Sequence, residues 1–177
     1  MSFLHVSHNK HHHCTTYLTS YTHHIYTTQR KIAFDQNYGY EYTLLEPEDF
    51  WRRVPPRVIP TYHFFNAPVP ANTTDPLSPL KIIRDVATVD DFVSFKLDID
   101  TPSVEIPLAL ELLRNPHVSK LVDEFFFELH FRCEIMKRCG WKDKMPEEYM
   151  GLQLDRLHAM LYFQELRKLG IRAHIWP

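Results

Sequence analysis

The chain has 177 residues, of which 44% are hydrophobic and 14% aromatic, and its formal net charge is −2. This length and hydrophobic content suit one domain built around one core. Residues 35–177 carry a charge of −5 against +3 in residues 1–34, so the body of the protein has no field that attracts phosphate backbones, and we expect no nucleic-acid partner.

No run of 18 or more uninterrupted apolar residues is present, and the first residues lack the apolar segment of a secretory signal peptide. We therefore expect no transmembrane segment and an intracellular, cytoplasmic protein. The three cysteines, Cys14, Cys133 and Cys139, have no CxxC spacing and fit a reducing compartment. The composition gives no indication of the oligomeric state.

Residues 1–34 differ in composition from the rest of the chain. They contain no acidic residue and hold seven of the twelve histidines. We interpret this segment as a disordered tail, in which the tract His11, His12 and His13 has no fixed metal-binding geometry. An organelle-targeting peptide is the second interpretation, although such peptides usually contain more arginine. Residues 35–177 then form the folded α/β domain.

From about Tyr38 onward, short apolar runs alternate with amphipathic segments, which is typical of repeated βα units. The predicted strands are residues 38–44, 61–66, 92–98, 124–130 and 171–176. The predicted helices are residues 47–53, 79–86, 104–114 and 153–169. The last helix has the clearest apolar periodicity and is followed by Gly170, a residue type favoured just beyond a helix end.

Strands 92–98 and 124–130 are nearly continuous apolar runs, as expected for central strands that helices cover on both sides. The sequence therefore predicts an α/β fold with a Rossmann-like, mostly parallel sheet and helices on both faces. In open α/β sheets, ligands bind just outside the carboxyl ends of the strands. We expect the functional residues at that edge.

Four polar residues end these two strands: Asp98, Asp100, Glu128 and His130. In a strand that continues, Asp98 and Asp100 share a face, and so do Glu128 and His130. If the strands are neighbours, the four side chains form a site for Mg²⁺ or Mn²⁺, or a histidine base oriented by an acid. The alternative is structural, with Asp100 capping the next helix or shaping the turn before it.

Glu41 follows the strand predicted over residues 38–44, where nucleotide-binding folds place an acid that binds ribose hydroxyls. Tyr40 is a candidate for stacking on an adenine ring, or else a packing residue of the strand. The chain has only four glycines, so it contains no GxGxxG or Walker loop, and it has no GxSxG motif. Hydrolase functions therefore have no support.

Three segments together resemble the FkbM-type S-adenosylmethionine-dependent methyltransferases over roughly residues 36–177. They are Tyr40-Glu41, the run from Val93 to Asp100 with Glu105 beyond it, and Phe126-Phe-Glu-Leu-His130. The resemblance implies S-adenosylmethionine as cofactor, bound by Glu41, Tyr40 and Asp100. It also implies methyl transfer to a hydroxyl oxygen of a small molecule or glycan, with Asp98 and His130 as catalytic residues.

The chain departs from the family pattern in its turns and at its start. Thr101 and Pro102 replace a Gly-Ala turn, and the pair Glu46-Pro47 lies beyond the strand-end acid Glu41. The first strand of the family, with its glycine loop, is missing, and its loss would leave unpaired edges in the middle of the sheet. Three explanations stand: residues 19–28 fill the gap, the family's second and fourth strands pair directly, or the sequence is truncated.

These observations give three hypotheses for the function. The first is a methyltransferase-like protein, which is either active or inactive through loss of the glycine loop. The second is a non-catalytic Rossmann-like interaction protein. The third is a metal-dependent glycosyltransferase in which Asp98-Ile99-Asp100 is the DxD pair that holds the cation of a nucleotide sugar.

Overall fold

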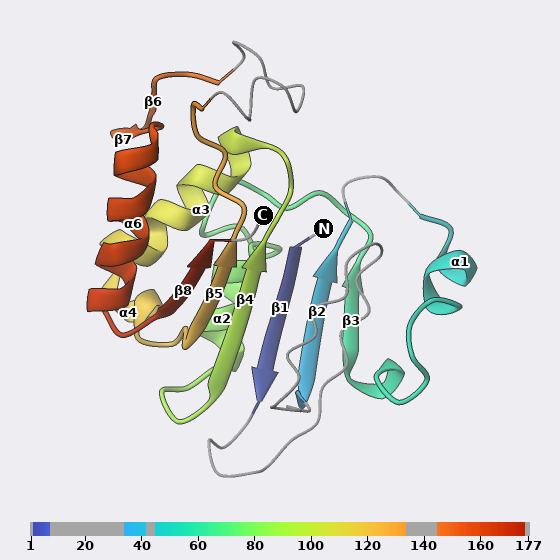
Figure 1. Cartoon of the computed structure of the whole chain (residues 1–177). Coiled ribbons are helices and arrows are strands. Elements are labelled where there is room, and N and C mark those ends of the chain that lie inside the picture. The colour runs from blue at the N-terminus through green and yellow to red at the C-terminus, as the bar shows by residue number, and fades with distance from the viewer. Residues whose placement is uncertain (1, 8–33, 42–44, 134–144, 176–177) are drawn as a thin grey trace.

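A computed structural model describes residues 2–7, 34–41, 45–133 and 145–175. It shows a mixed α/β fold in which helices pack against a central sheet (Figure 1). No helix in these ranges is long and apolar enough to cross a bilayer.

Six strands of the described chain form one sheet in the order β3-β2-β1-β4-β5-β8. Their bounds are Ser2–Ser7 (β1), Gln36–Tyr40 (β2), Tyr62–Phe65 (β3), Phe92–Leu97 (β4), Glu124–Phe127 (β5) and Arg172–Ile175 (β8). The pairs β2–β3, β4–β5 and β5–β8 are parallel. Each of the five strands predicted from the sequence overlaps a strand of the described chain, with bounds that differ by up to three residues at the described ends.

Strand β1 occupies the middle of the sheet and runs antiparallel to both of its neighbours (Figure 1). Its residue Phe3 lies opposite Gly39 of β2 on one side and Lys96 of β4 on the other. The sequence predicted a disordered tail for this part of the chain, but Ser2–Ser7 form a strand. Residues 19–28, the candidate for filling the gap, lie outside the described residues, and β2 and β4 do not pair directly.

The helices of the described chain are close to the predicted ones. Their bounds are Pro47–Trp51 (α1), Pro79–Val86 (α2), Pro102–Arg114 (α3), Pro116–Ser119 (α4) and Arg156–Lys168 (α6), with a 3-10 turn at Ile59–Thr61 (η1). Helix α3 begins earlier than predicted because Pro102 is tolerated in a first helical turn. Helix α6 begins later because Asp155 caps it and the preceding residues form the hairpin of β6 (Glu148–Tyr149) and β7 (Leu152–Gln153).

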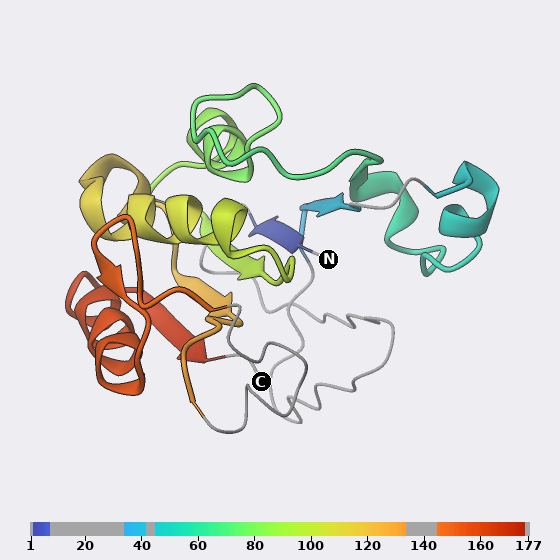
Figure 2. The ribbon, with the colours of Figure 1, turned by 90° about the horizontal axis from the view of Figure 1, so that it is seen from above.

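Helices α2, α3, α4 and α6 lie on the same side of the sheet (Figure 2). The expected cover on both faces is therefore not found in the described part of the chain. The strands explain the difference, because residues alternate between the two faces of a sheet. Phe95 and Phe125 point to the helices and are fully buried, whereas Lys96 and Glu124 belong to the opposite face, and their side chains are 16% and 22% exposed.

The core between the sheet and its helices combines aliphatic side chains with a group of aromatic ones. Phe95 and Phe125 stack with ring centroids 5.4 Å apart, and Phe127 contacts Tyr162 and Phe163 of α6. The Tyr162 hydroxyl donates a hydrogen bond to the carbonyl of Ala109 in α3, 2.8 Å away. This bond satisfies the buried hydroxyl and ties α6 to α3, so the two helices next to the carboxyl edge are held in a fixed relation.

Candidate functional site

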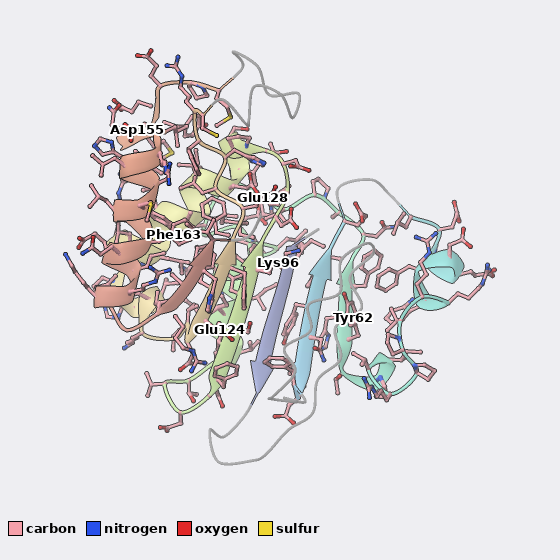
Figure 3. The ribbon with its side chains drawn as sticks, viewed as in Figure 1. Tyr62, Lys96, Glu124, Glu128, Asp155 and Phe163 are labelled. Carbon is pink, nitrogen blue, oxygen red and sulfur yellow. The ribbon has the colours of Figure 1, made fainter. Side chains whose placement is uncertain are left out.

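Strands β4 and β5 are parallel neighbours, as the sequence argument required, so the polar residues that follow them meet at one edge. The amide of Glu128 donates to the carbonyl of Leu97, which extends the ladder beyond β5. Figure 3 shows Lys96 and Glu128 toward the carboxyl ends of these strands. The carboxyl groups of Asp98 and Glu128 are hydrogen-bonded to each other.

Asp98 is held by a cation that the sequence argument did not assign to the site. Lys96 Nζ lies 2.6 Å from Asp98 Oδ2, and both side chains are largely buried. Burial acts to raise the pKa of Asp98, but hydrogen bonds from Lys96 and Glu128 outweigh it and hold that pKa below its usual range. Asp98 is therefore ionised at neutral pH and is a weak proton acceptor.

Glu128 has the opposite tendency. Burial, its hydrogen bond to Asp98 and the negative charges of Asp98, Asp100 and Glu105 together raise the pKa of Glu128 to about 7. The proton that the two carboxyl groups share thus resides on Glu128. A carboxyl group with a pKa near the working pH is suited to general acid or base chemistry.

The strand does not continue through Asp100, so the shared face predicted for Asp98 and Asp100 in a continuing strand does not apply. The strand ends at Leu97, and Asp100 has a φ of 58°, in the left-handed region that aspartate tolerates better than most residues. Its Oδ1 lies 3.5 Å from Nε2 of His130. Asp98 is thus paired with Lys96 and Glu128, whereas Asp100 lies beside His130.

His130 is the buried member of this group, with a side chain only 3% exposed. Its Nε2 lies 3.5 Å from Glu128 Oε1 as well as from Asp100 Oδ1. Burial lowers the pKa of His130 against the opposing effect of Asp100 and Asp98, so its imidazole is neutral at pH 7. One donor atom from each of Asp100, Glu128 and His130 lies within 4.8 Å of the others.

Glu105 of α3 organises the turn that carries Asp98 and Asp100. Its carboxyl oxygens accept hydrogen bonds from the amides of Ile99 (2.8 Å) and Thr101 (3.2 Å). Burial raises the pKa of Glu105 to about 7, despite these two bonds, which lower it. The sequence placed Glu105 next to the motif but gave it no role. Its signal was an acid in the first turn of a helix, where backbone amides need acceptors.

Glu41 follows β2, and its amide donates to the carbonyl of Phe65 in β3. Because β2 and β4 both pair with β1, Glu41 and Asp98 lie at the same edge with the amino end of β1 between them. Tyr40, in contrast, is 2% exposed and stacks on Phe65 with ring centroids 4.7 Å apart. Tyr40 is a core residue and presents no face to a ligand.

The described structure thus brings Asp98, Asp100, Glu128 and His130 together and adds Lys96 and Glu105 to them. It places Glu41 across β1 from this group and Tyr40 in the core. Comparison of the chain with protein-family models, with curated proteins and with solved structures found no match.

Proposed function

We propose that the protein is a Rossmann-like, methyltransferase-like domain that binds S-adenosylmethionine at the carboxyl edge of its sheet. The observation that carries this proposal is the strand order β3-β2-β1-β4-β5-β8 with an acid after β2 and another after β4. This is the strand order of dinucleotide-binding α/β sheets, in which β1 occupies the middle position.

The chain leaves the middle of the sheet in two directions, from β2 to β3 on one side and from β4 to β5 and β8 on the other. Ligands of open α/β sheets bind where this direction reverses, at the carboxyl ends of the strands. Glu41 lies on one side of this point and Asp98 on the other. We assign the ribose hydroxyls of the cofactor to Glu41 and the reacting centre to the Asp98–Glu128 side.

In methyl transfer to a hydroxyl oxygen, the new C–O bond forms as the C–S⁺ bond breaks, and S-adenosylhomocysteine leaves. The hydroxyl proton must go to a base. Of the carboxyl groups at this edge, Glu128 is better suited than Asp98, because its pKa is about 7 whereas Lys96 and Glu128 keep the pKa of Asp98 low. An acceptor that is a small molecule or a glycan fits this chemistry.

The test is calorimetric titration of the full chain with S-adenosylmethionine and S-adenosylhomocysteine. We expect saturable binding that Glu41→Gln weakens about tenfold, the cost of one lost hydrogen bond to a charged acceptor. Glu48→Gln, a change at an exposed acid in α1, serves as control and should bind like the wild type. Absence of binding by a protein with an intact circular dichroism spectrum contradicts the proposal.

A non-catalytic interaction role is the second candidate, and the direction of β1 favours it. Because β1 is antiparallel to β4, its carboxyl end lies at the edge of the sheet opposite Asp98, whereas the first strand of dinucleotide-binding sheets ends beside the cofactor. A folded protein that binds neither adenosyl compound would support this candidate. The glycosyltransferase hypothesis has less support, because only Asp100 of the DxD pair belongs to the group of three donor atoms, while Asp98 is paired with Lys96.

A further inference from the structure

Asp100, Glu128 and His130 come from two neighbouring strand ends and converge on one point. Asp100 belongs to the turn between β4 and α3, and the other two follow β5. His130 Nε2 lies 3.5 Å from an oxygen of each acid, and the three donor atoms lie within 4.8 Å of one another. We infer that these three side chains form a binding site for a divalent metal ion of the Mn²⁺ type.

The distances fit ligands of a common ion better than they fit hydrogen bonds. A separation of 3.5 Å is long for an N–H···O bond, whose usual length is about 2.9 Å. Two donor atoms that each lie about 2.1 Å from one ion are separated by about 3.0 to 3.4 Å at octahedral or tetrahedral angles. Small side-chain adjustments would therefore let all three atoms contact one cation.

The donor set and its burial point to the class of ion. Two carboxylates and one imidazole combine the hard oxygen ligands preferred by Mg²⁺ and Mn²⁺ with a nitrogen that Mn²⁺ accepts readily. His130 is 3% exposed and supplies a fixed inner ligand, whereas Glu128 is 31% and Asp100 71% exposed. The outer side of the site is thus open to water or to a substrate oxygen.

The surroundings hold the donors in place and supply negative charge. Glu105 binds the amides on both sides of Asp100, so the backbone of this ligand is fixed before a cation arrives. Asp98 adds a further carboxylate beside Glu128, and Lys96 balances it. Asp98 itself is left out of the ligand set because the donor atoms that lie within 4.8 Å of one another come from Asp100, Glu128 and His130.

Titration of the full-length protein with Mn²⁺, followed by the electron paramagnetic resonance signal of the free ion, tests this site without any cofactor or activity. We expect one saturable site whose affinity falls at least about tenfold in Asp100→Asn and in Glu128→Gln, because each removes a charged ligand. Asp90→Asn makes the same charge change at an exposed acid before β4 and should leave the affinity unchanged.

The histidine tract of residues 11–13 is a competing binder, so a variant with His11→Asn, His12→Asn and His13→Asn is titrated in parallel. Retention of the saturable site in this variant supports the inference, and its loss overturns it. Equal affinities of wild type, Asp100→Asn and Glu128→Gln, or no saturable binding, also overturn it. Failure here leaves the proposed binding of S-adenosylmethionine untouched, since the two titrations share no ligand.

Discussion

Glu105 is a carboxyl group in a buried position with two backbone amides as partners and two acids nearby. Burial raises its pKa from 4.5 to about 7, and the charges of Asp100 and Asp98 act in the same direction. A folded-state pKa above the unfolded value means that the folded protein holds the proton more tightly. Stability from this group is therefore full below about pH 4.5 and is lost as the pH rises toward 7.

We predict that Glu105→Gln flattens the dependence of the free energy of unfolding on pH between about 4.5 and 7. The raised pKa of Glu105 corresponds to a change in the free energy of unfolding on the order of 3 kcal/mol across this pH range. The variant keeps some slope because the pKa of Glu128 is also raised to about 7. Urea unfolding at several pH values in the presence of a chelator measures the effect, and Glu48→Gln is the control. A slope as steep as in the wild type would contradict the prediction.

At the level of single residues, the sequence predicted which side chains meet but not how they pair. The polar ends of two neighbouring parallel strands must share an edge, so Asp98 and Glu128 were foreseeable neighbours. The left-handed backbone of Asp100 was not foreseeable. It belongs to a turn whose amides are bound by Glu105, a residue of the following helix. The burial of Tyr40 depends on its stacking with Phe65 of β3, a contact that no local pattern encodes.

Helix α6 ends in a glycine cap, which the sequence predicted at Gly170. Gly170 has a φ of 94°, its amide donates to the carbonyl of Arg167, and the amide of Ile171 donates to that of Leu166. These two bonds satisfy carbonyls that the end of a helix leaves open, and the left-handed residue between them is usually glycine. The turn then leads directly into β8.

We predict that Gly170→Ala lowers the free energy of unfolding by about 1 kcal/mol, and that Gly170→Asn lowers it less. The reason is backbone strain alone, because a Cβ at Gly170 meets no atom within 4 Å. Chemical unfolding of both variants measures the difference. An alanine variant as stable as the wild type, or asparagine costing more than alanine, would show that the motif does not require this conformation.

At the level of elements, apolar periodicity and capping residues predicted the positions of the helices. They did not predict which face of the sheet the helices cover. Strands β4 and β5 looked continuously apolar because Phe92 and Phe126 stand at outward positions beside Lys96 and Glu124. Phe126 stacks on His174 with ring centroids 4.6 Å apart, so an aromatic side chain at such a position has a neighbour within the sheet itself. An apolar run was therefore insufficient to predict helices on both faces.

For the whole molecule, the decisive element is β1, which connects the pair β3–β2 to the group β4–β5–β8. Composition could not reveal it, since Ser2–Ser7 is a short polar and apolar mixture next to a histidine-rich segment. Its role follows from long-range pairing: His5 lies opposite Asn37 of β2 and Ser94 of β4. Six residues thus determine whether the sheet is continuous.

We predict that His5→Pro destabilises the protein by about 3 kcal/mol or more, because proline removes an amide from a strand that pairs on both sides. His5→Ala keeps the amide and is the matched control, so any cost of the side chain is measured separately. Urea unfolding and amide hydrogen exchange of β2 and β4 follow the change. Equal stability of the two variants would mean that β1 does not contribute its ladder to the folded protein.

The pairing of β1 also has a consequence for the order of folding. Phe3 lies opposite Lys96, so β1 finds this partner only after more than 90 further residues have been synthesised (96 − 3 = 93). Contacts of such long sequence separation carry a large loop-closure entropy and slow the search for the native state. The pairs β4–β5 and β1–β2 join residues 30 to 38 positions apart, so their loop closure costs less entropy. The pairing of β1 with β4 is thus expected to close after these two, and until it closes the facing edges of β1 and β4 stay unpaired and prone to aggregation.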